Sequence, residues 1–241
     1  MNSNEIKEKY NQIVHDSNGD YEAKRWSGDA VQRAAHEMTR LSIERLISFE
    51  SFTRFLELGP GPGTWTKIFI AKNSSAHFDL VDISEEMIKQ GRQNLAAHRQ
   101  VSYILGDFLN FSANQKYDFF FSSRVIEYFP NKDILIKKIF ELMKNNSVGF
   151  IITKTPKYLR QKLLGKTIPH LHQGQIKPKE LAELLRENEF TEIEVYPVTM
   201  TFPLFHSAKL KTLLYYLLCR FRLNFINHLF SESYCVKFVK L

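Results

Sequence analysis

Apolar and polar residues alternate along the chain with two different periods. Across residues 29–49, apolar side chains recur every three or four positions, which predicts an amphipathic helix. Residues 5–16 are predicted to form another helix. The stretch 20–29 between them contains two aromatic residues and several turn-forming residues, so a turn-rich connection is predicted there.

From residue 54 onward, short apolar runs alternate with amphipathic stretches. The predicted strands are 55–59, 77–82, 101–105, 117–122, 148–154, 191–198 and 234–240. The predicted helices are 64–72, 84–98, 133–144 and 179–188. Ser84 is expected to cap its helix, because an acidic first turn follows it. Strands that alternate with helices form βαβ units, so we expect a mainly parallel sheet with right-handed crossovers.

A glycine-rich loop, Leu56-Glu-Leu-Gly-Pro-Gly-Pro-Gly63, follows the first predicted strand and precedes a helix. Glycine allows a tight turn there and lets backbone N–H groups approach a ligand. Asp82 and Asp107 end the next two predicted strands. Ligands of parallel sheets bind at the carboxyl ends of the strands, so we expect the loop, both aspartates and residues 122–127 along one edge.

These strand ends suit a nucleoside. Asp82 can accept hydrogen bonds from both ribose hydroxyls, and Asp107 can pair with an exocyclic amine while Phe108 packs against the base. Each carboxylate alone is equally well interpreted as a helix cap or a solvated strand end. The glycine loop, Asp82 and Asp107 lie at the ends of three successive predicted strands, and together they favour a nucleoside site. The G-x-G-x-G spacing differs from the G-x-G-x-x-G of dinucleotide sites, which disfavours the alternative of a NAD-linked oxidoreductase.

Residues 50–155 resemble class I S-adenosylmethionine (SAM)-dependent methyltransferases, especially the broad small-molecule group. The motifs that carry the resemblance are Glu57-Leu-Gly-Pro-Gly-Pro-Gly63, Val81-Asp-Ile-Ser84, Gly106-Asp-Phe108 and Tyr117-Asp118 through Ser123-Arg-Val-Ile-Glu-Tyr128. The resemblance implies SAM as cofactor and S-adenosylhomocysteine (SAH) as product. The residues that it implies for SAM binding are Glu57 near the methionine amine, Gly59, Gly61, Gly63, Thr64, Asp82, Ile83, Asp107, Phe108, Ser123 and Arg124, with Tyr21 and Trp26 from the N-terminal segment.

The alternation and the resemblance together predict a Rossmann-like three-layer α/β sandwich. Its seven-stranded sheet is expected to be mostly parallel, with the last strand antiparallel. We expect one methyltransferase domain over residues 1–241. Its predicted parts are a helical lid over residues 1–50 that includes Arg25, a SAM-binding core over 51–156, an acceptor-side loop over 157–178 and a helical insertion over 203–231.

Candidate catalytic residues follow the fourth and fifth predicted strands. His170 and His172 can remove a proton from an acceptor hydroxyl or orient the acceptor, although two exposed loop histidines are an equally ordinary interpretation. Glu127 and Tyr128 are expected to face the transferred methyl group. A metal site is not predicted, because His-x-His supplies only two ligands.

The net charge of +7 is concentrated late in the chain, in residues 154–180 and 203–241. Such basic segments attract anionic small molecules, lipids or nucleic acid, although solvated lysines explain them equally well. Interleaved aromatic and basic strand residues typical of RNA-binding modules are absent, so no nucleic acid partner is expected. The insertion is predicted to cap an apolar acceptor pocket or to contact a membrane surface; an ordinary packed helix and a homodimer interface are the alternatives.

The combined interpretation is methyl transfer from SAM to a small or lipid-like acceptor, with an anionic acceptor among the options. Oxygen is favoured as the methylated atom because loop histidines are available. N- or C-methylation is an alternative, and a non-catalytic SAM-fold binding protein or RNA-associated module is another. Two cysteines, an N-terminus without an apolar leader and the lack of a membrane-spanning apolar run predict a cytoplasmic protein.

Overall fold

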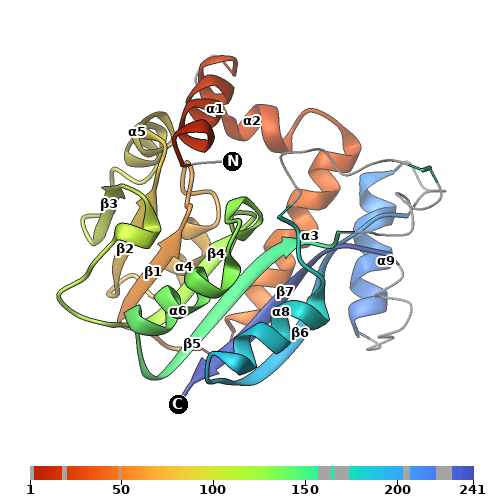
Figure 1. Ribbon diagram of the computed structural model, residues 1–241. Helices are drawn as coiled ribbons and strands as arrows, with labels where there is room; N and C mark the ends of the chain where they lie inside the picture. The colour runs from red at the N-terminus through yellow and green to blue at the C-terminus, as the bar shows by residue number, and fades with distance from the viewer. Residues whose placement is uncertain are drawn as a thin grey trace.

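Seven strands form one sheet in the order β3-β2-β1-β4-β5-β7-β6 (Figure 1). The computed structural model describes residues 3–17, 21–48, 50–156, 164–165, 174–202, 207–220 and 230–241. The strands are β1 (Arg54–Leu58), β2 (His77–Asp82), β3 (Val101–Leu105), β4 (Tyr117–Ser123), β5 (Met143–Lys154), β6 (Phe190–Met200) and β7 (Ser231–Lys240). Only β7 runs antiparallel to its neighbours β5 and β6. The predicted sheet, including its antiparallel last strand, is confirmed.

Helices cover both faces of this sheet (Figure 1). They are α1 (Ser3–His15), α2 (Tyr21–Trp26), α3 (Ala30–Leu46), α4 (Thr66–Lys72), α5 (Glu85–Asn94), α6 (Lys132–Leu142), α8 (Pro178–Glu187) and α9 (Ala208–Arg220). Successive strand residues point to opposite faces, so Phe55 packs with α3, α4 and α5 while Leu56 packs with α6 and α8. Burying both faces explains why the central strands β1 and β4 are nearly continuous apolar runs.

Polar side chains fix several helix starts, as local sequence predicts. Ser84 accepts a hydrogen bond from the Met87 N–H at 3.2 Å and so caps α5. Asp29 accepts from two N–H groups at the start of α3. These caps satisfy backbone donors that have no partner within the helix.

Several expected boundaries were wrong: the helix predicted to reach residue 98 ends at Asn94, and the last strand begins at Ser231 rather than 234. The predicted connection at residues 20–29 contains α2, a six-residue helix. Tertiary packing explains it, because the Trp26 ring lies 5.3 Å from that of Trp65, and packing outweighs the weak helical tendency of so short a segment. The fifth strand begins at Met143 rather than 148, because Met143 already pairs with Tyr117 of β4; the preceding helix therefore ends at Leu142.

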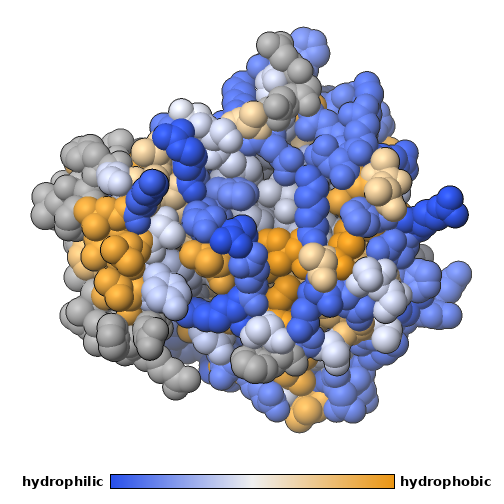
Figure 2. All heavy atoms as spheres, turned by 180° about the vertical axis from the view of Figure 1, so that it is seen from behind, coloured by the Kyte–Doolittle hydropathy of each residue, from blue (hydrophilic) through white to orange (hydrophobic). Residues whose placement is uncertain are grey.

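Helix α9 lies in the predicted insertion between β6 and β7. Tyr215 packs there with Ala34 and Met38 of α3 and with Met200 of β6. The outer face of α9 leaves Leu210, Leu213 and Leu217 exposed. Figure 2 shows apolar side chains gathered on the side of the molecule where α9 lies. Among the described residues, every helix is too short or too polar to cross a membrane. The roles considered for the insertion as pocket cap, membrane contact or homodimer interface stay predictions.

Candidate active site

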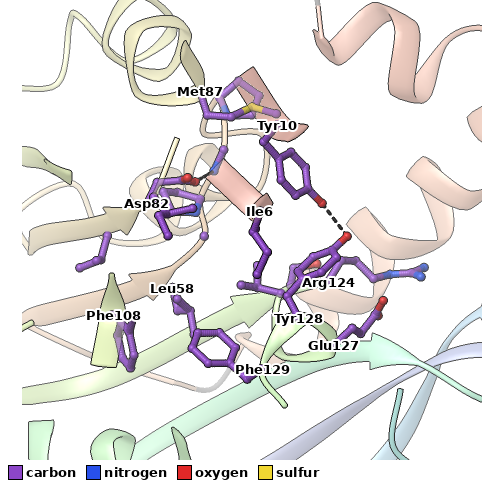
Figure 3. Close-up of a pocket in the computed structure, with 18 of the residues that line it drawn as sticks. Ile6, Tyr10, Leu58, Asp82, Met87, Phe108, Arg124, Glu127, Tyr128 and Phe129 are labelled. Carbon is purple, nitrogen blue, oxygen red and sulfur yellow. Dashed lines mark hydrogen bonds between the residues drawn. The ribbon is translucent and has the colours of Figure 1, made fainter. Parts of the chain in front are cut away.

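A cavity of about 610 Å³ lies at the carboxyl ends of the parallel strands, beneath α1 and α2. Its walls come from the loop after β1, the ends of β2, β3, β4 and β5, and the inner faces of the two N-terminal helices. Figure 3 shows Asp82 and Phe108 on one side of this space and Arg124, Glu127 and Tyr128 on the other. The cavity therefore has two chemically different ends.

The glycine loop requires glycine for both conformation and space. Gly59 has a φ of 67°, and its N–H donates to the Val81 carbonyl at 2.8 Å. A Cβ added to Gly59 would lie 2.3 Å from Cγ2 of Val125. Gly61 also has positive φ, 55°, and its N–H donates to Oδ2 of Asp82 at 3.0 Å. The turn is thus joined directly to the end of β2.

Asp82 and Asp107 both line the cavity, and each carboxylate already has protein donors. The other oxygen of Asp82 accepts the Ser84 N–H at 2.9 Å. Burial raises the pKa of the Asp82 carboxyl, and backbone N–H donors oppose that rise. Asp107 accepts the Leu109 N–H at 3.0 Å and the hydroxyl of Ser3 at 2.6 Å. A carboxylate oxygen can accept two hydrogen bonds, so both groups keep acceptor capacity toward the cavity.

Glu57 lies behind the loop and is absent from the cavity lining. Its Oε2 accepts a hydrogen bond from the Thr66 hydroxyl at 2.7 Å. Complete burial raises the pKa of this carboxyl to about 8, because charging it in a low-dielectric interior is unfavourable. Gly63 is also outside the lining and packs against Leu95.

Helix α1 closes the cavity with polar contacts to both ends. At one end, the Ser3 hydroxyl donates a hydrogen bond to Asp107. At the other end, the Tyr10 hydroxyl lies 2.6 Å from the Tyr128 hydroxyl (Figure 3). Burial is the main reason that the pKa values of both tyrosines are raised, that of Tyr128 to about 12. Ile6 and Ile13 share the cavity-facing side of α1 with Tyr10. Sequence reasoning missed these residues, although their spacing of three and four positions was the available signal.

The end beyond β4 carries several charges. Arg124 and Lys154 line the cavity at the ends of β4 and β5, and Arg25 reaches it from α2, 4.6 Å from the Trp26 ring. Glu127 is buried, and its Oε1 accepts the Lys154 N–H at 2.8 Å and the Thr153 hydroxyl at 3.1 Å. Burial, followed by the charge of Arg124, lowers the pKa of Lys154.

Most of the residues predicted from sequence meet in this cavity. Those in its lining are Tyr21, Trp26, Gly59, Gly61, Thr64, Asp82, Ile83, Asp107, Phe108, Ser123, Arg124 and Glu127. His170 and His172 lie outside the described residues. Sequence reasoning missed Met87 and Lys154, which also line the cavity. Only tertiary packing brings these two residues next to the other lining residues.

Comparison with known proteins identifies a family. Residues 49–197 match the family model described as a methyltransferase domain. Malonyl-[acyl-carrier protein] O-methyltransferase 2 of Ilyobacter polytropus is 26% identical over 125 residues, 52% of this chain and 46% of that protein. Trans-aconitate 2-methyltransferase of Enterobacter sp. is 26% identical over 125 residues, 51% of this chain and 48% of that protein. The chain thus spans about half the length of these curated relatives.

Solved structures show the same fold. A SAM-dependent methyltransferase from Archaeoglobus fulgidus superposes with a TM-score of 0.65 at 18% identity, covering 90% of this chain and 97% of that one. Magnesium protoporphyrin IX methyltransferase from Synechocystis, solved with bound SAH, gives a TM-score of 0.66 at 17% identity over the whole of both chains. The resemblance to class I SAM-dependent methyltransferases is confirmed, and the chain belongs to the methyltransferase domain family.

Proposed function

We propose that this protein transfers a methyl group from SAM to an oxygen atom of a small or lipid-like acceptor. The observation that carries the proposal is one cavity that joins a glycine loop and two strand-end aspartates to a second, charged wall. Its volume of about 610 Å³ falls in the range of about 300–1,000 Å³ typical of small-molecule sites. That space fits a nucleoside cofactor at one end and an acceptor at the other.

The nucleoside end fits SAM. Asp82 retains free lone pairs for ribose hydroxyls, and Asp107 retains them for the adenine amine. Ile83 and Phe108 line the space for the base. Gly59 and Gly61 leave the turn without side chains, so ligand atoms can approach the backbone there.

The methionine end is assigned to Thr64, Ser123, the Arg124 backbone and the lid residues Tyr21 and Trp26. Glu57, behind the loop, would act on the methionine ammonium through the field of its buried carboxyl rather than by lining the cavity. A nearby ammonium favours the ionised carboxylate. When bound, SAM supplies a methyl group on a positively charged sulfur, which a nucleophile can accept.

The acceptor end is assigned to Glu127, Tyr128 and the segment 157–178. Methyl transfer depends chiefly on placing the nucleophile in line with the methyl group, which enclosure by α1 and α2 supports. His170 or His172 would take the proton of a hydroxyl acceptor. Oxygen as the acceptor atom is supported by the relative named as an O-methyltransferase.

Isothermal titration calorimetry with SAH tests the cofactor assignment. Asp82→Ala should weaken SAH binding about tenfold or more, because charge-assisted hydrogen bonds to the ribose are lost. Asp82→Asn, which keeps one acceptor oxygen for the loop, should lose less. Asp16→Ala, an exposed aspartate of the N-terminal segment, serves as the matched control. Unchanged SAH affinity in Asp82→Ala, or equal binding of NAD, would contradict the assignment.

Mass spectrometry and NMR of the methylated product test the acceptor atom. A methyl resonance on oxygen is expected. A methyl on nitrogen or carbon would favour the alternative chemistry, and a SAM-binding protein without turnover on any acceptor tested would favour the non-catalytic alternative.

A further inference from the structure

Two cations stand side by side along the acceptor end of the sheet. Arg124 follows β4 and Lys154 ends β5, and both line the cavity. β4 and β5 are neighbours, with Ser123 paired to Ile152, and the Arg124 N–H donates to the Ile152 carbonyl at 2.8 Å. The nucleoside groups belong instead to β1, β2 and β3 on the other side of β4. The two cations therefore lie beyond the cofactor end.

Arg124 is held in an unusual conformation with an unused donor. Its φ of 63° is in the left-handed region, which costs energy for a residue with a side chain. Its Nη1 is buried and has no hydrogen-bond partner within the part of the chain that the structure describes. Buried guanidinium donors are normally satisfied. The side chain points away from Asp82 in Figure 3, so the unused donor belongs to the acceptor end.

The carboxylates nearby are engaged by other groups. Glu127 accepts the Lys154 backbone N–H and the Thr153 hydroxyl. Glu232 of β7, whose charge also acts on Arg124, accepts the Thr201 hydroxyl at 3.0 Å. Among the described residues, neither Arg124 nor Lys154 forms an ion pair within 4.0 Å of a carboxylate.

Bound SAM would add further positive charge to this end. Its sulfonium and ammonium carry two positive charges, and its carboxylate carries one negative charge. At the acceptor end the cavity wall contributes Arg25, Arg124 and Lys154 against Glu127, whereas Asp82 and Asp107 lie at the nucleoside end. An acceptor with a negative charge would balance this excess in a partly desolvated site, where unpaired charges are costly.

We propose that Arg124 and Lys154 form an anion subsite that binds a carboxylate group of the acceptor. The proposal rests on the proposed function and specifies its substrate class. A guanidinium binds a carboxylate through charge-assisted hydrogen bonds and leaves lone pairs on the carboxylate oxygens free. A carboxylate also presents oxygen without a proton to remove, so such an acceptor would need no general base.

The test measures cofactor and anion binding separately, on the full chain. SAH binding is first measured for the wild type, Arg124→Gln, Arg124→Lys and Lys154→Gln. The SAH complex is then titrated with acetate, malonate and trans-aconitate, and with dimethyl malonate as the neutral probe. Lys132→Gln is the matched control, because Lys132 is a partly buried cation near Glu127 that lies outside the cavity lining. Circular dichroism melts verify folding of each variant.

The expected result is binding of at least one carboxylate by the wild-type SAH complex, with dimethyl malonate bound much more weakly. Arg124→Gln and Lys154→Gln should weaken carboxylate binding about tenfold or more. Arg124→Lys should retain part of that binding, and Lys132→Gln should retain it fully. SAH affinity should change less than about threefold in Lys154→Gln and Lys132→Gln, and less than about tenfold in the Arg124 variants.

Three results would overturn the anion subsite. The first is no binding of any carboxylate to the wild-type SAH complex. The second is equal carboxylate binding by Arg124→Gln, Lys154→Gln and the wild type. The third is a tenfold loss of SAH affinity in Arg124→Gln, which would assign that guanidinium to the carboxylate of the cofactor. Failure of the wild type to bind SAH at all would instead refute the proposed function.

Discussion

Gly59→Ala should destabilise the protein through two separable effects. The φ of 67° places a residue with a Cβ in the left-handed region, which costs about 1–2 kcal/mol. The new Cβ would also lie 2.3 Å from Cγ2 of Val125, and overpacking of this kind costs about 1–3 kcal/mol. Together these effects predict a loss of about 2–5 kcal/mol in the free energy of unfolding.

Two other glycines of the site separate these effects. Gly61→Ala also meets positive φ, but its nearest atom would be Sδ of Met87 at 3.7 Å, so only the conformational cost of about 1–2 kcal/mol is expected. A Cβ at Gly106 would meet nothing within 4 Å, and Gly106→Ala should be neutral or stabilise by up to about 1 kcal/mol.

Urea unfolding of these variants checks the order of stabilities, and a double-mutant cycle with Val125→Ala isolates the clash. The Val125→Ala change removes both Cγ atoms, the two nearest to the new Cβ, and leaves only Cβ at 3.2 Å, so Gly59→Ala should cost less in that background. Equal stability of Gly59→Ala and Gly106→Ala, or strict additivity in the cycle, would refute the reasoning.

Three further predictions concern charge, the packing of α1 and catalysis. Burial raises the pKa of Glu57 to about 8, so the folded protein keeps a proton that the unfolded chain releases. Its contribution to stability is full at acidic pH and falls as the pH rises towards 8, and Glu57→Gln should remove this fall in urea unfolding across that range. Tyr10→Phe removes the hydrogen bond between the Tyr10 and Tyr128 hydroxyls, so the free energy of unfolding should fall by about 1 kcal/mol. The amides of α1 should then exchange their hydrogens faster, and unchanged exchange would show that this hydrogen bond does not hold α1 in place. With a hydroxyl acceptor, His170→Ala and His172→Ala should lower turnover with SAH affinity preserved, and full turnover in both would remove them as proton acceptors.

The parts of the fold that local sequence determines were predicted well. The alternation of strands and helices, the glycine turn and the Ser84 cap each depend on residues close together in the chain. The short helix α2 was missed because packing of Trp26 on Trp65 stabilises it, and no periodic pattern fits into six residues. The early start of β5 depends on its pairing with β4.

The site was predictable where a residue ends or directly follows its own strand, as Asp82 and Asp107 do. It was not predictable where the contact joins distant segments. Ser3 and Asp107 are 104 positions apart, and nothing in either local sequence indicates their hydrogen bond. The raised pKa of Glu57 and its absence from the cavity lining likewise depend on burial beneath the loop. The charged acceptor end needed the pairing of β4 with β5 to bring Arg124 beside Lys154.

The insertion between β6 and β7 leaves the sheet and returns to it at one point. Met200 pairs with Ser231, and the Thr201 N–H donates to the Phe230 carbonyl at 3.0 Å. The entropy lost by closing such a loop grows only with the logarithm of its length. Where the packing of Tyr215 on α3 is kept, sequence can therefore be added between these two positions at little entropic cost to the hairpin, which makes this junction a natural place for related chains to diverge and for a domain to be grafted.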